Sequence, residues 1–440
     1  MESTDALSMF FKEQAGRVLC VAEDMSLFRT LRYAISGLAG TTEETVLLCQ
    51  EPEDAFEQLE TFKKGTIPTI VVVERTIQGE KTTDFILRVS RLFPEMCLLI
   101  VGSGITKELA AYFCEIGVSS IISKPASAED VLKKLVGCVV VSREQHLTTY
   151  VRELIADSRP EEALEAVSKY LAVRPESSLA YCLKGDILLT SGDLSEALVA
   201  YEKAVSLNTC FTEPLRRMAA VYKRVDDTKA LGLLRKMDDI NAFNPDRKLE
   251  MGEILLRQGD EDGARVQFDT GFKQASQEFS TLLGDYAERI ASLASDSPEL
   301  AKGYLAKVLE TKKTFTAYDI HMFNKLGMLY RNNGEWSEAL KVYTKALDIA
   351  PNDPALYYNM ALAYHDGGKS GEVRRCLSKS FAIDATYYKG NEGVSYNIGA
   401  MYMGQGNAAE ARPFFEHVLE INPKNDKARK KLDRCAPAPS

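Results

Sequence analysis

IHMFNKLGMLYRNNGEWSEALKVYTKALDIAP, residues 320–351, aligns without a gap with SLAYCLKGDILLTSGDLSEALVAYEKAVSLNT, residues 178–209. The two stretches share glycine at repeat positions 8 and 15, alanine at positions 20 and 27, and tyrosine at position 24. Small residues at such spacings let two helices approach closely, and a glycine between them suits a turn. The pattern therefore predicts a helix–turn–helix unit that recurs along the chain.

This unit recurs with decreasing clarity past Arg143. Partial copies lie at 144–177, 245–278, 354–387 and 392–425, whereas 212–244 and 279–319 are irregular. A period of about 34 residues with G-x₂-Y, A-x₃-Y/F and a closing proline resembles the tetratricopeptide repeat (TPR). The resemblance implies an all-α superhelix over residues 142–435, which ends in a polar capping helix at 426–435. Residues 436–440 are expected to be a disordered tail.

The first 140 residues follow a different pattern, in which short β-branched runs alternate with helical periodicity. The runs predict strands at 18–23, 45–50, 69–73, 97–102 and 118–123. A helix is expected after each of them. Five such units predict an α/β domain, residues 16–141, with a five-stranded parallel sheet covered on both faces. Residues 1–15 are expected to be an N-terminal extension.

Polar residues and a glycine follow several of these strands, at the sheet edge where α/β domains place their sites. They are Glu23, Asp24, Glu74, Gly102 and Lys124. The stretch GVSSIISKPASAEDVLKKL (117–135) sets Lys124 directly before a proline. With this stretch, residues 16–138 resemble the receiver domain of bacterial two-component response regulators. The resemblance implies a flavodoxin-like fold.

The resemblance also implies a phosphorylation site, from which this sequence departs. In active receivers an acidic pair and an aspartate bind Mg²⁺, the aspartate accepts a phosphoryl group, and a hydroxyl and a lysine bind its oxygens. Here Glu74 stands in place of that aspartate and Gly102 in place of the hydroxyl residue. Glutamate is longer, and misplacing a nucleophile by about 1 Å can cost about 100-fold in rate. We therefore predict a pseudo-receiver in which Glu74 imitates the phosphorylated state.

Several alternatives stay open for this pocket. Mg²⁺ could still bind to Glu23, Asp24 and Glu74, because hard cations prefer carboxylate oxygens. Ser103 could supply the hydroxyl for phosphorylation. Lys124 could simply pair with the carboxylates and close the pocket. Beyond the Mg²⁺ alternative we expect no cofactor, no metal site and no catalytic residue.

The TPR resemblance further implies a concave face, lined by the first helix of each repeat, that binds a protein or peptide. The residues expected there are Arg216, Lys223, Arg224, His321, Asn324, Met328, Arg331, Asn332, Tyr358, His365 and Tyr396. Aromatic, methionine and arginine side chains are common interface anchors. In the alternative interpretation, Tyr358 and Tyr396 pack between helices and the charged side chains are solvated.

Composition excludes other classes of partner. The formal charge is −9, and the one basic cluster, residues 424–434, is typical of a solvated helix face, so no nucleic-acid partner is expected. No apolar run approaches the roughly 18 residues that span a bilayer, so no membrane partner is expected either. Nine cysteines are scattered singly. This spacing favours reduced thiols and a cytoplasmic location.

The preferred function is a non-enzymatic bacterial signalling adaptor. A pseudo-receiver head would dock or form a homodimer, and a TPR arm would bind a protein partner independently of phosphorylation. The alternative is a phosphorylatable two-component response regulator with a TPR protein-binding output. A third hypothesis is a structural scaffold in which both domains are inert.

Overall fold

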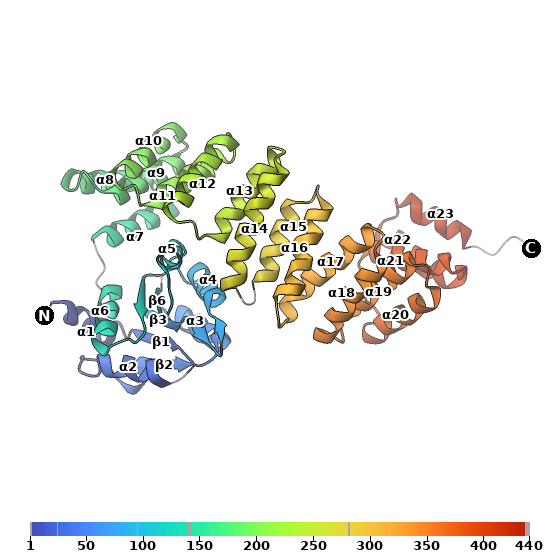
Figure 1. The fold of residues 1–440 in the computed structure, drawn as a ribbon, viewed down its shortest axis with the longest axis horizontal. Helices are drawn as coiled ribbons and strands as arrows, with labels where there is room; N and C mark the ends of the chain where they lie inside the picture. The colour runs from blue at the N-terminus through green and yellow to red at the C-terminus, as the bar shows by residue number, and fades with distance from the viewer. Residues whose placement is uncertain (1, 24, 95, 140–142, 280–281, 436–440) are drawn as a thin grey trace, which may run out of the picture. The chain divides into compact units, whose positions relative to one another are not determined.

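The computed structural model describes residues 2–23, 25–94, 96–139, 143–279 and 282–435 (Figure 1). The chain divides into two compact units, Met1–Ser280 and Thr281–Ser440, and each is described by itself. The first unit holds an α/β domain and the helices up to α14, and the second holds α15 to α23.

Within the described residues, the α/β domain is built on a parallel sheet with strand order β2-β1-β3-β6-β7. This confirms the five-stranded parallel sheet predicted from the sequence. The strands are β1 (Arg17–Val21), β2 (Val46–Cys49), β3 (Thr69–Glu74), β6 (Cys97–Gly102) and β7 (Ser120–Ser123). A short hairpin, β4 (Thr76–Ile77) with β5 (Glu80–Lys81), follows the central strand.

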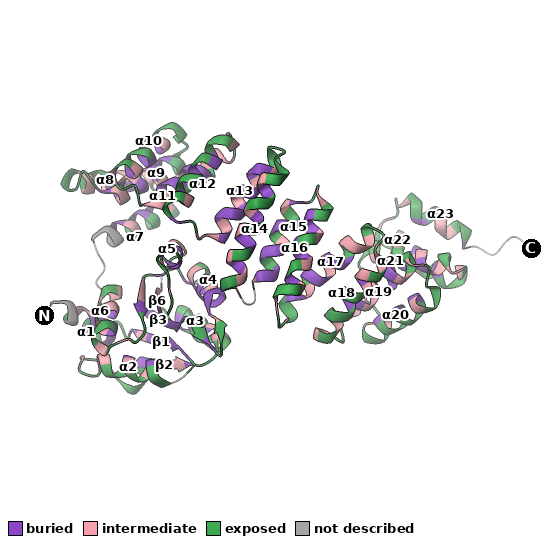
Figure 2. Ribbon diagram, in the orientation of Figure 1, coloured by how far each residue is buried: buried purple, intermediate pink, exposed green. Residues whose placement is uncertain are grey.

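Helices cover both faces of the sheet, so every residue of β3 is buried (Figure 2). They are α1 (Glu2–Lys12), α2 (Met25–Ile35), α3 (Pro52–Lys64), α4 (Thr83–Leu92), α5 (Lys107–Glu115) and α6 (Ala128–Val139). Residues 1–15, expected as an extension, contain α1. Its Leu7, Phe10 and Phe11 are buried in the core cluster that also contains Leu135 of α6. The N-terminal segment is thus part of the domain.

Cys97 and Cys138 form a disulfide between the start of β6 and the end of α6. Their Cα atoms lie 5.9 Å apart, within the usual range for this bond. The prediction that all nine cysteines are reduced was therefore wrong for this pair. The two residues are 41 positions apart, and their approach depends on how α6 crosses the sheet.

The rest of the described chain consists of paired helices. In the first unit these are α7 (Arg143–Ala156), α8 (Pro160–Val173), α9 (Ser178–Ser191), α10 (Leu194–Leu207), α11 (Thr212–Tyr222), α12 (Asp227–Ile240), α13 (Pro245–Arg257) and α14 (Glu261–Glu278). In the second unit they are α15 (Leu283–Leu293), α16 (Pro298–Thr311), α17 (Ile320–Asn332), α18 (Trp336–Ile349), α19 (Pro354–Asp366), α20 (Ser370–Ile383), α21 (Glu392–Gly404), α22 (Ala408–Ile421) and α23 (Asp426–Arg434). The stretches with irregular sequence thus still form helix pairs.

The shared glycine of the repeat packs against the shared aromatic residue of the partner helix. A Cβ atom on Gly185 would lie 2.4 Å from the ring of Tyr201, and one on Gly327 would lie 2.3 Å from the ring of Tyr343. Both tyrosines are buried. The glycine is therefore required by the close approach of the two helices, as the sequence pattern predicted.

The last helix, α23, packs on α22 and buries Ala428, while Cys435 directly after it is also buried. This arrangement agrees with the predicted capping helix. The tail expected at 436–440 lies outside the described residues. In the described ranges, none of the helices is both long and apolar enough to cross a bilayer.

Candidate functional site

The carboxylate of Glu74 lies at the end of β3 and is only 5% exposed. Its Oε1 accepts a hydrogen bond from Lys124 Nζ, and its Oε2 accepts one from the backbone N–H of Glu23 at 3.2 Å. Three of the predicted pocket residues are therefore in contact. The Lys124 side chain is 46% exposed, so solvent reaches this ion pair from the side of the lysine.

The β4–β5 hairpin contacts the exposed carboxylate of Glu23. Glu23 Oε2 accepts from the N–H of Gln78 at 2.9 Å, and Gln78 Nε2 donates to Glu51 Oε1 at 2.7 Å. Asp24 lies outside the described residues. Among the residues that the structure does describe, no three His, Cys, Asp or Glu side chains are grouped to hold a metal ion. Mg²⁺ binding by Glu23, Asp24 and Glu74 stays a prediction.

Gly102 lies beside Arg75, a residue that the sequence analysis did not select. A Cβ atom at position 102 would lie 2.7 Å from the Cβ of Arg75. Arg75 extends along this space, and its NH1 donates to the carbonyl oxygens of Ser103 at 3.0 Å and Gly104 at 3.1 Å. The loop after β6 is thus held by a guanidinium group. The one signal in the sequence was a cation placed directly after a buried strand.

In the first unit, the cations predicted to line the concave face are largely engaged by neighbouring carboxylates. Arg216 binds Glu213 through two hydrogen bonds of 2.9 and 2.5 Å, and Lys223 lies 2.7 Å from Glu253. Arg224 is exposed. Burial raises the pKa of the nearby Glu250 carboxyl. Arg216 and Lys223 therefore offer little unpaired charge to a partner.

In the second unit, several predicted groove residues are accessible. His321, Met328, Asn332 and His365 are exposed, and the exposed fraction of Met328 is 47%. Two other predicted groove residues, Asn324 and Arg331, contact neighbouring helices. Asn324 Oδ1 accepts from Asn359 Nδ2 at 2.9 Å, and Arg331 Nε donates to Asp366 at 2.7 Å.

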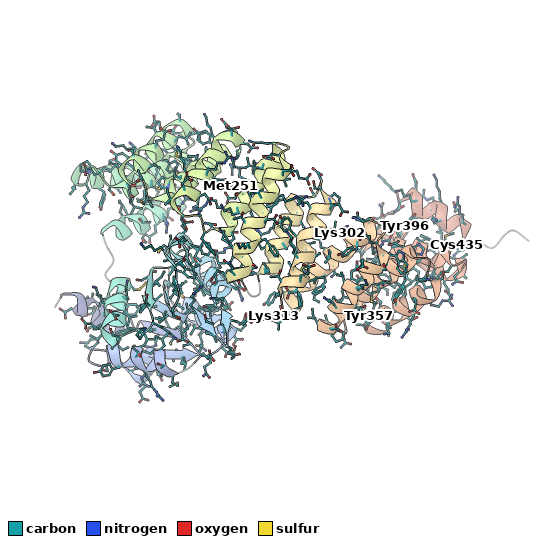
Figure 3. All side chains as sticks on the ribbon, in the orientation of Figure 1. Met251, Lys302, Lys313, Tyr357, Tyr396 and Cys435 are labelled. Carbon is teal, nitrogen blue, oxygen red and sulfur yellow. A yellow bond between two sulfur atoms is a disulfide. The ribbon has the colours of Figure 1, made fainter. Side chains whose placement is uncertain are left out.

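The two tyrosines expected in the groove pack between helices. Tyr358 is only 6% exposed, and its hydroxyl accepts from Asn397 Nδ2 at 3.0 Å. Tyr358 therefore follows the alternative interpretation, in which its ring packs between helices, here against Tyr387. Tyr396 is half-buried, with its ring centroid 5.7 Å from that of Phe415 (Figure 3).

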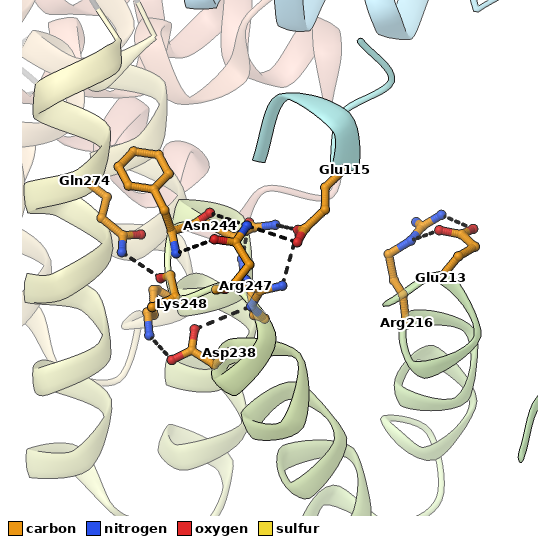
Figure 4. A network of polar contacts seen from close by, with 11 residues as sticks. Glu115, Glu213, Arg216, Asp238, Asn244, Arg247, Lys248 and Gln274 are labelled. Carbon is orange, nitrogen blue, oxygen red and sulfur yellow. Dashed lines mark hydrogen bonds and ion pairs between the residues drawn. The ribbon is translucent and has the colours of Figure 1, made fainter. Parts of the chain in front are cut away.

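Sequence reasoning also missed a contact between the α/β domain and the solenoid inside the first unit. Glu115, at the end of α5, accepts from Asn244 Nδ2 at 2.7 Å and from Asn241 Nδ2 at 3.1 Å (Figure 4). It also pairs with Arg247 at 3.3 Å, whose side chain is 2% exposed. The rings of Tyr112 and Phe243 meet edge to face beside this cluster. Burial raises the pKa of Tyr112.

A second cluster joins the same two parts of the first unit. Arg75 NH2 donates to Glu278 Oε1 at 2.8 Å, and Thr83 Oγ1 donates to Glu278 Oε2 at 3.1 Å. The Arg75 and Glu278 side chains are 9% and 6% exposed. Since 203 positions separate them, no local pattern could have predicted the pair.

Comparison with known proteins identifies the repeats. Family models described as TPR repeat or tetratricopeptide repeat match residues 151–208, 327–368 and 393–425. All three segments lie in the helical part of the chain, and repeats of this class mediate protein–protein interaction. The bacterial two-component setting expected for the head gains no support from these matches.

Two curated proteins with similar sequences share low identity with this chain. DnaJ homolog subfamily C member 7 of Mus musculus is 27% identical over 146 residues, which are 33% of this chain and 27% of that protein. BBSome complex member BBS4 of Bos taurus is 22% identical over 253 residues, 54% of this chain and 44% of that protein. The chain thus spans less than half the length of these two relatives.

Among solved structures, the C-terminal part of a TPR repeat-containing protein from Cytophaga hutchinsonii is 20% identical. The match covers 64% of this chain and 98% of that chain, with a TM-score of 0.39. The glycine–aromatic packing in four helix pairs, α9–α10, α13–α14, α17–α18 and α21–α22, agrees with the three family-model matches. The helix pairs in residues 151–208, 327–368 and 393–425 therefore belong to the tetratricopeptide repeat class.

Proposed function

We propose that this chain is a non-catalytic signalling adaptor, in which the solenoid binds a protein or peptide and the α/β head acts without phosphorylation. The observation that carries this proposal is the state of Glu74. Both of its carboxylate oxygens already have protein partners, and the lysine that would neutralise an incoming phosphoryl group is one of them. Such a pocket resembles a receiver held permanently in its phosphorylated form.

The inner face of the second unit is the surface that we assign to the partner. Its exposed residues include Met328 and Asn332, whose side chains carry no charge, so a partner can contact them without breaking an ion pair. Methionine adapts its shape to irregular partner surfaces. A protein or peptide segment that contributes apolar side chains fits this face better than a strongly charged one.

Treatment with acetyl phosphate and Mg²⁺ tests the state of the head. We expect the intact mass of the chain to stay unchanged. A covalent adduct of about 80 Da, the mass that phosphorylation adds, would favour the phosphorylatable response regulator instead.

Capture of partners from a lysate of the source organism tests the solenoid. Full-length chain carrying Met328→Asp should lose a partner that the unaltered chain retains, because a charge would enter an apolar contact. Met9→Asp is the matched control, since Met9 is 52% exposed but lies on α1 of the head. Equal losses in both variants would contradict the assignment. The cytoplasmic location and the head-mediated homodimer stay predictions.

A further inference from the structure

One network of hydrogen bonds connects the head pocket with the solenoid inside the first unit. It begins at Glu74, whose backbone oxygen accepts from Thr82 Oγ1 at 2.6 Å. The N–H of Thr82 donates to the carbonyl oxygen of Arg75 at 3.0 Å, and the N–H of Arg75 donates to Val101 at 2.9 Å. The end of β3 and the start of α4 are therefore joined directly beneath the pocket.

The same network then converges on a single carboxylate of the solenoid. Glu278, the last residue of α14, accepts from both Arg75 and Thr83. Arg75 also holds the carbonyl oxygens of Ser103 and Gly104. Three segments that border the pocket thus depend on the position of one solenoid residue.

This cluster is buried, so its geometry matters for stability. Glu278 is 5% exposed, Arg75 is 8% exposed, and Thr83 is fully buried. A buried charge that loses its partner is strongly unfavourable, so the loss of one contact in this cluster destabilises the others. Networks of hydrogen bonds and ion pairs of this kind can carry energetic coupling between two sites.

We propose that Glu278 is a positioning residue that couples the head pocket to the docking of the head on the solenoid. When Glu278 binds Arg75 and Thr83, it orders the segments around Glu74. By thermodynamic reciprocity, a change at the Glu74–Lys124 pair must alter docking at the end of α14. This inference goes beyond the adaptor function, because it requires neither a partner nor phosphorylation.

The second interface cluster provides a matched control. Glu115 also joins the head to the solenoid, through Asn241, Asn244 and Arg247. Its side chain makes these contacts from the C-terminal end of α5, and the partners that the structure describes for it are all solenoid residues. Glu278→Gln and Glu115→Gln remove the same charge from the same interface. Only Glu278→Gln removes it from the network that reaches Glu74.

Hydrogen–deuterium exchange of the full chain tests the proposal. In Glu278→Gln we expect exchange to become about tenfold faster in residues 74–83 and 101–106, as the loss of a charged hydrogen bond implies. In Glu115→Gln we expect faster exchange at 241–248 and unchanged exchange in the pocket segments. In Lys124→Ala, which alters the pocket alone, we expect faster exchange at 275–279.

Two results would overturn the coupling. One is a Glu278→Gln variant whose pocket segments exchange as slowly as those of the unaltered chain. The other is a Glu115→Gln variant that loosens the pocket equally, since any loss of docking would then suffice. Thr83→Val removes one donor to Glu278 without changing the charge, so it gives a second variant should Glu278→Gln fail to fold. It must loosen the same pocket segments.

Discussion

Replacing Gly102 with alanine tests why the head lacks a side chain where receivers carry a hydroxyl. The added Cβ would lie 2.7 Å from the Cβ of Arg75 and 3.4 Å from its Cδ. The nearer of these atoms is fixed by the backbone at the end of β3, so a rotamer change of Arg75 cannot remove the clash. The two strands must therefore separate locally, and Arg75 must shift away from Glu278.

Overpacking of this kind costs about 1–3 kcal/mol, and we expect the α/β domain to lose that amount of stability in Gly102→Ala. Urea unfolding of the full chain, combined with hydrogen exchange of β3 and β6, would measure the loss. Tryptophan fluorescence would not, because the single tryptophan, Trp336, lies in the second unit. Since the chain has two units, the two transitions must be analysed separately.

Gly137→Ala is the matched control for this substitution. Gly137 lies inside α6, and an added Cβ there would have no other atom within 4 Å. Alanine is the better helix former by about 0.5–1 kcal/mol, so the control should stabilise the domain. Our interpretation of Gly102 would be refuted if Gly102→Ala were as stable as the unaltered chain, or if both substitutions changed stability in the same direction.

Two further predictions concern the repeats and the cysteines. Gly327→Ala should destabilise the second unit by roughly 1–3 kcal/mol, because its Cβ would meet the Tyr343 ring. The fluorescence of Trp336 during denaturation measures this loss of stability. An unchanged denaturation midpoint would exclude close packing at this position. In the native chain, iodoacetamide should label the exposed Cys210 but not Cys182, whose pKa burial raises to about 12. Cys97 and Cys138 should become reactive only after a reductant is added, and labelling without reductant would contradict the disulfide.

Periodicity was sufficient to predict both architectures. Residues 69–73 form a buried β-branched run, and the structure places β3 at Thr69–Glu74. Glu23, Glu74 and Lys124 could be grouped in advance because the carboxyl ends of parallel strands meet at one edge of a sheet. The repeat was predictable for a similar reason, since a fixed spacing between glycine and tyrosine recurs wherever two helices cross closely.

Side-chain environment was less predictable than the fold. Tyr358 occupies a repeat position that usually faces the groove, yet whether its ring points outward depends on the neighbouring Tyr387, which lies in an irregular spacer. The lysine and arginine residues of the first unit were expected to be available for a partner. Arg216 pairs with Glu213 of the same helix, and Lys223 pairs with Glu253 of α13. Pairing between helices depends on packing that spacing alone does not specify.

The contact between head and solenoid explains one departure from the receiver pattern. From the sequence, Gly102 indicated only a lost hydroxyl. In the structure the missing side chain leaves room for Arg75, and Arg75 binds Glu278 of the solenoid. A side chain at position 102 would compete with Arg75 for the same space. A side chain at position 102 would therefore conflict with the buried ion pair, so the glycine and the attachment of the head to the solenoid have one physical cause.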